Sequence, residues 1–315
     1  MSFPSKVFSL MLASALLLAS CSNSSRGEAA RGGAGQGDTA KVDCSLALMA
    51  TLDCLPFFYA DTHGIYRRLG MDVAVTPYRS QLACDTALTR GAADIVYSDH
   101  LVAKRAGQKA AEGWETALSL NDAWTLVAYR GLRIRNVKAL EGRDIGITRS
   151  CESLERLEAT LKANGLGAEQ VYLPQINDLN IRMRMVSQGQ IAAAMLTEPY
   201  TAAAAARGNT LLPTDGKSEA SHSRLLRRKG KQALPDGKWQ TIIKGYNMAV
   251  DSINERGLNC CADILINHYG LDPQMADTMR LPRPLSHKYS VVTRLLVYSF
   301  TRLLKLCPTQ KLQHT

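Results

Sequence analysis

Polar and charged side chains gather at five points where a predicted strand gives way to a predicted helix. An arginine there can hold a carboxylate or sulfonate through two parallel hydrogen bonds. Free N–H groups at a helix start favour an anion, and carboxylates accept hydrogen bonds from amine or ring N–H groups. These residue types suit the non-covalent capture of a small polar solute. They are Asp53 and Cys54; Arg79, Ser80 and Gln81; Ser98 and Asp99; Arg149, Ser150, Cys151 and Glu152; and Glu198 and Tyr200.

Each of these groups also has a purely structural interpretation, which the sequence leaves open. Asp53 and Ser150 stand where an N-cap residue would begin a helix, and Arg79 is also explained as an exposed loop charge. Tyr59 and Trp124 are candidates to stack on a flat ligand, but core packing is the better explanation of both. The ligand role of all these residues is therefore a hypothesis for the structure to address.

Strand-like and helix-like segments alternate along most of the chain, as is typical of βαβ units and a parallel sheet. A first set has strands at 45–52, 71–76 and 93–97 with helices at 55–69 and 81–90. A second set has strands at 118–129, 144–148, 170–173 and 191–196 with helices at 153–163, 179–188 and 200–206. Two sets predict an α/β fold of two lobes, with the polar turns at the carboxyl ends of the strands, where such sheets bind ligands.

The last third of the chain reads differently. Residues 238–269 are predicted to be helical with a break at Gly257, and the basic run Arg224–Lys231 is interpreted as a solvated helix end. Residues 281–315 form a tail with basic residues and no acidic ones. Three explanations of this tail stay open: an amphipathic membrane-surface helix at 288–306, a changed reading frame, or ordinary packing on a lobe.

The amino terminus has the pattern of a bacterial lipoprotein signal. Lys6 precedes an apolar run at 7–18 that is too short to span a bilayer, and Leu18-Ala-Ser-Cys21 resembles a lipobox. We expect cleavage before Cys21 and lipidation of its thiol, so that the polar, Gly- and Ser-rich segment 22–41 tethers the protein to a membrane.

Charge and cysteine content exclude several function classes. The net charge of +10 resides mainly in the two ends of the chain, so the nearly neutral body gives no reason to expect nucleic-acid binding. The cysteines lack zinc or haem spacing, and we expect no metal and no cofactor. A disulfide between Cys54 and Cys84 is one option, since both lie near the predicted cleft.

Several segments together resemble the substrate-binding lipoproteins of ABC transporters in the nitrate/sulfonate/taurine and thiamine-pyrimidine-precursor group. The resemblance covers roughly residues 42–280 and implies a type 2 periplasmic-binding-protein fold, with two α/β lobes, two crossing segments and a ligand cleft. The segments are 51–60 (TLDCLPFFYA), 63–66 (HGIY), 69–73 (LGMDV), 91–94 (GAAD), 140–146 (LEGRDIG) and 197–202 (TEPYTA).

The resemblance also suggests how the chain is divided and what it meets. It implies lobe I (42–128 with 220–280) and lobe II (129–219). These follow the signal peptide (1–20) and the tether from Cys21 (21–41), and the tail (281–315) departs from the family pattern. The expected partners are a small-molecule ligand and the permease and ATPase of an ABC importer, with the protein itself a monomer. A thiamine-pyrimidine precursor is the first ligand candidate and a sulfonate-like anion the second.

Two other functions remain for such a chain. The same fold occurs in fungal pyrimidine-precursor synthases and in menaquinone-pathway enzymes. However, the dense His-Cys-Cys-Cys cluster of the synthases has only Asn259-Cys260-Cys261 as a counterpart here. A sensory module that binds a solute without a permease is the second alternative. We expect a binder that makes and breaks no bond.

Overall fold

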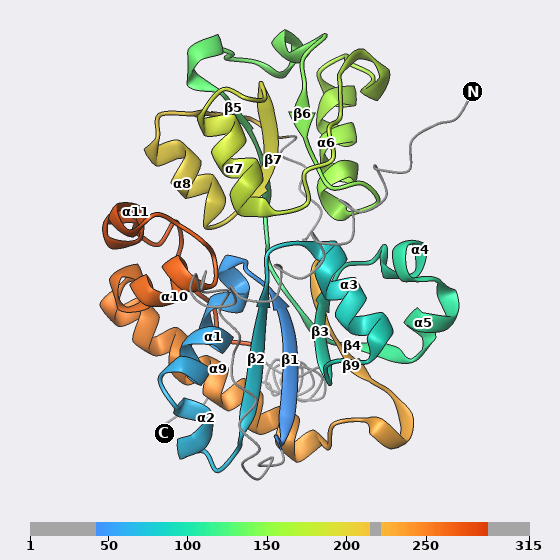
Figure 1. The fold of residues 1–315 in the computed structure, drawn as a ribbon, viewed down its shortest axis with the longest axis vertical. Coiled ribbons are helices and arrows are strands. Elements are labelled where there is room, and N and C mark those ends of the chain that lie inside the picture. The colour runs from blue at the N-terminus through green and yellow to red at the C-terminus, as the bar shows by residue number, and fades with distance from the viewer. Residues whose placement is uncertain (1–41, 215–221, 289–315) are drawn as a thin grey trace, which may run out of the picture. The chain divides into compact units, whose positions relative to one another are not determined.

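Two β-sheets organise the part of the chain that the computed structural model describes, residues 42–214 and 222–288 (Figure 1). The first sheet has the order β2-β1-β3-β9-β4. Strand β1 runs parallel to β2 and β3, whereas β9 is antiparallel to β3 and β4. Its strands are β1 (Cys44–Met49), β2 (Val73–Tyr78), β3 (Ile95–Ser98), β4 (Trp114–Ser119) and β9 (Arg224–Arg228).

Helices cover this first sheet and form lobe I with it. The predicted helix 55–69 is two helices, because Gly64 adopts a left-handed conformation (φ 64°) between them. Gly245 of α9 permits this segment to pack closely, since a Cβ at residue 245 would lie 2.4 Å from the Tyr66 ring of α2. The helices are α1 (Leu55–Thr62), α2 (Ile65–Arg68), α3 (Gln81–Arg90), α4 (Val102–Ala106), α5 (Gln108–Glu112), α9 (Asp236–Arg256), α10 (Ala262–Asn267) and α11 (Pro273–Thr278).

The second sheet has the order β6-β7-β5-β8 and belongs to lobe II. Leu126 and Ala128 face a hydrophobic cluster of lobe II alone, while Val127 between them packs in the larger cluster, as alternation along a strand requires. Its strands are β5 (Trp124–Ala128), β6 (Ile145–Gly146), β7 (Ala193–Thr197) and β8 (Thr210–Leu212). Its helices are α6 (Glu152–Ala163), α7 (Leu179–Ser187) and α8 (Tyr200–Ala206). Short 3₁₀ helices lie at Leu52–Cys54, Arg130–Leu132, Val137–Leu140, Ala168–Gln170, Gly230–Gln232 and Leu258–Cys261.

Three sequence expectations about the elements are wrong. Among the described residues, strand β5 pairs with β7 and β8 alone, so the change of sheet precedes Trp124 and does not fall at residue 128. Segment 170–173 forms only isolated bridges, such as Tyr172 with Asp144. The run from Arg224 is an inner strand and not a helix end. Its Leu225 and Leu226 are buried on both sides, and Arg227 reaches outward to Glu115.

Residues 281–288 pack on lobe I as an extended segment. Asn254 of α9 exchanges hydrogen bonds of 2.8 Å with the backbone of Leu285, and Asn247 does the same with Lys288 at 2.8 and 2.9 Å. Two helical turns and three extended residues both span about 10 Å, which makes this match possible. For these residues the structure favours lobe packing among the explanations of the tail. The predicted helix at 288–306 lies almost wholly outside the described residues.

Candidate functional site

A small buried cavity lies where the two lobes meet. It has a volume of about 10 Å³, which is room for roughly one water molecule. In this structure the cavity is therefore too small for a larger solute. Its lining residues come from strand ends and helix starts of both lobes: Met49, Gln81, Tyr97, Asp99, Trp124, Thr148, Cys151, Glu152, Ser153, Asn177, Leu179 and Ser223.

Asp99 of lobe I reaches the start of helix α6 in lobe II. Its Oδ2 accepts a 3.0 Å hydrogen bond from the backbone N–H of Glu152, the first residue of α6. The sequence suggested Ser150 as the N-cap of this helix. The N-cap is instead Cys151, whose side chain makes no capping hydrogen bond. Ser150 has a left-handed backbone (φ 54°) that turns the chain ahead of it. A carboxylate of the opposite lobe therefore adds to the negative charge that Glu152 and Glu155 already supply in the first turn of α6.

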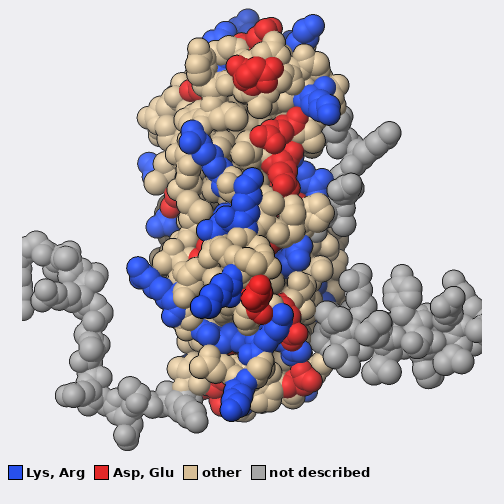
Figure 2. Space-filling view, turned by 90° about the vertical axis from the view of Figure 1, so that its right-hand side faces the viewer, with Lys and Arg blue, Asp and Glu red and all other residues tan. Residues whose placement is uncertain are grey.

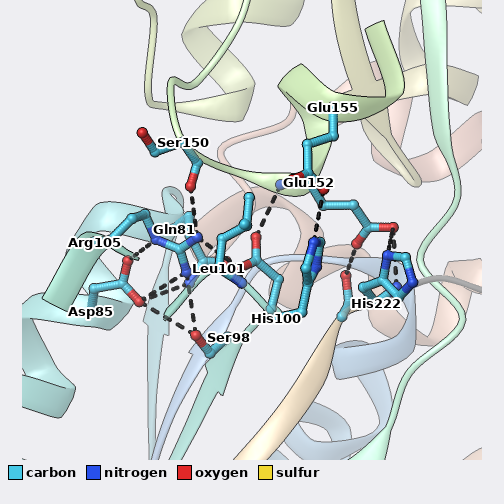
Figure 3. Close-up of polar contacts among 12 residues, drawn as sticks. Gln81, Asp85, Ser98, His100, Leu101, Arg105, Ser150, Glu152, Glu155 and His222 are labelled. Atoms are coloured by element: carbon cyan, nitrogen blue, oxygen red, sulfur yellow. Dashed lines mark hydrogen bonds and ion pairs between the residues drawn. The ribbon is translucent and has the colours of Figure 1, made fainter. Parts of the chain in front are cut away.

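Arg105 on α4 holds the lobe I side of this contact (Figure 3). Its guanidinium pairs with Asp85 and Asp99, and it also donates a 2.9 Å hydrogen bond to the Ser150 carbonyl oxygen in lobe II. Burial alone would lower the pKa of Arg105, but these carboxylates raise it. Arg105 was not among the predicted residues, because nothing in its own helix marks it as part of a cleft.

Glu152 is the second carboxylate of the cavity and also joins distant segments. Its Oε1 accepts hydrogen bonds from Arg156 and from the backbone N–H of His222, and its Oε2 lies 3.2 Å from the Ser223 hydroxyl. Beside it, His100 of lobe I lies 2.8 Å from Glu155 of α6, as Figure 3 shows. These contacts close the lobes over the cavity.

Two buried polar atoms of the lining have no hydrogen-bond partner among the described residues. They are the indole Nε1 of Trp124 and the hydroxyl of Ser153, a residue that is 0% exposed. The Thr148 hydroxyl accepts a hydrogen bond from the fully buried Arg182, so its own proton is available for donation. Trp124, Ser153 and Thr148 thus each offer a hydrogen-bond donor that a solute in the cavity could use.

A chain of polar groups runs from the cavity into lobe I. The Tyr97 hydroxyl lies 2.9 Å from the Ser223 hydroxyl and 3.0 Å from Asp122. Burial, with Asp53 nearby, raises the pKa of Asp122 to about 7. The Tyr97 hydroxyl can donate to Asp122 Oδ2 or to the Ser223 hydroxyl oxygen, and the Ser223 hydroxyl can donate to Glu152 Oε2. Asp122 and Tyr97 were missed because neither directly precedes a predicted helix.

The cavity brings together five of the residues proposed from the sequence: Gln81, Asp99, Trp124, Cys151 and Glu152. Ser153, which was missed, directly follows the proposed turn 149–152, so a wider window around that turn would have included it. Asn177 precedes α7, at a strand-to-helix turn that was not among the five proposed. Ser223 had no such signal, since it precedes a strand that was taken for a helix end.

The other proposed residues lie outside the cavity lining. Asp53 is engaged by Arg283 and Lys288 and is not the N-cap of α1, which is Cys54. The Arg79 side chain pairs with Asp178 at 3.5 Å, and the Arg79 carbonyl oxygen accepts a hydrogen bond from the backbone N–H of Leu179. Ser80 caps α3 through the backbone N–H of Ala83. His63 stacks on the Tyr59 ring, and Arg149 is exposed. The other three residues make hydrogen bonds: Ser98 to Asp85, Glu198 to the backbone N–H of Ala202, and Tyr200 to the carbonyl oxygen of Tyr269.

The cysteines take no part in covalent links within the described residues. Cys54 and Cys84 are both free and fully buried, so the disulfide considered from the sequence is not formed. Among the described residues, no group of three or more His, Cys, Asp or Glu side chains is arranged to hold a metal ion. The predicted lipidation site, Cys21, lies outside the described residues.

The surface and helices add two observations. Figure 2 shows Lys and Arg side chains scattered over one face with Asp and Glu side chains between them. This mixture differs from the continuous basic stripe of a nucleic-acid interface. Within residues 42–214 and 222–288, none of the helices has the length and apolar character of a membrane span.

The two-lobed fold is that of the periplasmic binding proteins. The alkanesulfonate-binding protein SsuA of Xanthomonas axonopodis pv. citri, bound to MOPS, superposes with a TM-score of 0.62 at 16% identity, over 84% of this chain and 94% of that chain. The aliphatic sulphonate-binding SsuA of Escherichia coli gives 0.59 at 15% identity, over 85% and 94%. A zinc-bound ligand-binding component of an ABC-type import system from Staphylococcus aureus gives 0.59 at 14% identity, over 84% and 92%.

The family follows from the sequence match. Residues 51–227, more than half of the chain, match the family described as NMT1/THI5 like, so the chain belongs to that family. The sequence has no match among the curated proteins.

Proposed function

We propose that this protein is the extracytoplasmic solute-binding component of an ABC importer. A small polar solute binds between the lobes, the lobes close over it, and the closed form delivers it to a permease. The observation that carries this proposal is the interlobe cavity, whose wall presents the unpartnered Trp124 Nε1 and Ser153 hydroxyl from segments far apart in the sequence. Family membership and the fold of the solute-binding neighbours support it.

A binding role fits the cavity better than catalysis does. Cys151 is the thiol in the lining, and burial raises its pKa to about 12. At neutral pH this thiol stays protonated and is a poor nucleophile. The thiol therefore supplies no nucleophile at neutral pH, in keeping with a protein that binds its solute unchanged.

The solute is a small, polar, partly planar molecule. A thiamine-pyrimidine precursor is the first candidate, in keeping with the NMT1/THI5-like family, and a sulfonate is the second, in keeping with the named ligands of the SsuA neighbours. A thermal-shift and calorimetry panel of thiamine precursors, sulfonates, taurine and nitrate tests the function. At least one solute should bind, and Trp124→Ala should weaken it; unchanged affinity in this variant would place the site elsewhere.

Attachment to a membrane through Cys21 completes the proposal. The lipobox-like Leu18-Ala-Ser-Cys21 supports it, since several acyl chains together hold a protein on a bilayer. In cells given a labelled fatty acid, the wild-type protein should carry label and sediment with membranes, and Cys21→Ser should do neither. A labelled Cys21→Ser variant would disprove the anchor.

A further inference from the structure

Asp99 occupies the position at the start of α6 where an anionic ligand would otherwise bind. We infer that the cleft selects an uncharged or cationic solute and rejects sulfonates and similar anions, an inference that rests on the proposed solute-binding function. The solute offers carbonyl or ring-nitrogen acceptors to the cavity donors and N–H donors to the cavity carboxylates. The SsuA neighbours share the fold, and sulfonate binding is a property of those proteins alone.

Helix α6 has the features of an anion site, and the protein fills it with its own carboxylate. The helix has 12 residues, its N-cap side chain makes no hydrogen bond, and the N–H of Glu152 points to Asp99 Oδ2 at 3.0 Å. A helix start attracts one negative charge strongly, and Asp99, only 3% exposed, supplies it.

Displacing Asp99 would break more than this one contact. Its Oδ1 accepts a 2.8 Å hydrogen bond from the backbone N–H of Leu101 and a 2.6 Å hydrogen bond from Arg105. An anion that pushed Asp99 aside would leave Arg105 short of a partner, so Asp99 stays in place. An anion bound beside it would face two nearly buried carboxylates, Asp99 and Glu152, at close range. Like charges in a buried site repel strongly.

The described residues that line the cavity include these two carboxylates and no Lys or Arg. Three cations lie behind the wall. Arg105 and Arg156 are paired with Asp99 and Glu152. Arg182 donates to the Ile176 and Met195 carbonyl oxygens, each at 2.8 Å, and reaches the cavity only through the Thr148 hydroxyl.

The cavity nevertheless requires hydrogen-bond acceptors from its solute. The Trp124 indole only donates, and the Ser153 hydroxyl has no partner among the described residues. Buried donors without partners cost free energy, and a solute acceptor removes that cost. An uncharged carbonyl oxygen or ring nitrogen meets this need without placing a second negative charge beside Asp99.

The test compares Asp99→Asn with Asp85→Asn in the full chain purified in detergent. Both variants remove one carboxylate from Arg105, but only the first neutralises the group at the start of α6. Calorimetry with methanesulfonate and with a neutral aminopyrimidine measures each charge class. We expect the wild type to bind only the neutral probe, and Asp99→Asn to bind methanesulfonate at least about tenfold more tightly than the wild type, with no gain in Asp85→Asn.

The outcomes separate the inference from the proposed function. Wild-type binding of methanesulfonate, or an equal gain in Asp85→Asn, overturns the inference and leaves the solute-binding function intact. If the folded wild-type protein binds neither of the two probes nor any other solute of the panel, both the inference and the proposed function are refuted. If Asp99→Asn does not fold, competition in the wild type decides the question: methanesulfonate should fail to displace the neutral probe, and displacement would refute the inference.

Discussion

The Asp53 carboxylate and the Lys288 ammonium group lie 2.9 Å apart, both nearly buried, although 235 positions separate them in the sequence. Arg283 approaches the other carboxylate oxygen at 2.6 Å. Burial would raise the pKa of Asp53, but the two cations lower it. A residue that the sequence placed among the ligand contacts therefore fastens the segment 281–288 to lobe I.

Removing the carboxylate of Asp53 should destabilise the protein strongly. Asp53→Ala leaves Lys288 buried without its counter-charge, which typically costs about 3 kcal/mol or more. Urea unfolding measures the change. Asp251→Ala is the matched control, because it breaks an exposed pair with His287 in the same segment and should cost less than about 1 kcal/mol. Equal effects of the two variants would refute this role of Asp53.

Trp124→Phe should change stability and solute affinity in opposite directions. The ring remains, but the buried N–H without a partner is removed, so the protein without solute should be as stable as wild type or more stable by up to about 1 kcal/mol. The bound solute loses one hydrogen bond, which should weaken affinity about tenfold. Thermal unfolding and calorimetry give the two quantities. Unchanged affinity would show that the indole N–H does not meet the solute.

Asp122 should make stability fall as the pH rises from about 4 to about 7. Its pKa in the folded protein is raised to about 7 from an ordinary value of 3.8, so its favourable contribution is complete below the lower value and is lost as the pH passes the upper one. Asp122→Asn should flatten this part of the pH–stability curve. The exposed Asp277→Asn should leave it unchanged, and a curve that keeps its slope in Asp122→Asn would contradict the prediction.

Asp53 acts in a different pH range. Its pKa is lowered, so the stability it contributes is present above its ordinary value of 3.8 and is lost only as the pH falls through the lower folded value. Asp53→Asn should therefore reduce the acid-induced loss of stability below about pH 4, where Asp122→Asn has little effect. The two variants thus affect different pH ranges of the curve of stability against pH.

Arg105→Leu should be among the most destabilising single substitutions in the cleft. It leaves Asp85 and Asp99 buried without their cation and removes the hydrogen bond to Ser150 of lobe II, for a cost of about 3–5 kcal/mol. Arg227→Leu, which breaks partly exposed pairs with Glu115 and Asp236, should cost about 1 kcal/mol or less. Denaturant midpoints that rank the two variants the other way would disprove the buried role of Arg105.

The α/β class and the bounds of several helices could be predicted from the sequence, because these depend on local signals. The helix Gln81–Arg90 matches its prediction, since Ser80 caps its start and Gly91 ends it in a left-handed conformation. The helix Tyr200–Ala206 matches as well. Turns that follow strands also pointed to Gln81, Asp99 and Glu152, which do line the cavity.

Which of these turns meet depends on the tertiary structure. Asp99 and Glu152 belong to different lobes, and their contact depends on how the lobes face each other, which no local pattern encodes. The same holds for Asp53, whose turn resembles the others but meets the carboxy-terminal segment instead of the cleft. Strand β9 was missed because a strand buried between two neighbours needs no alternating pattern, so its sequence resembles a basic helix end until the flanking strands are in place.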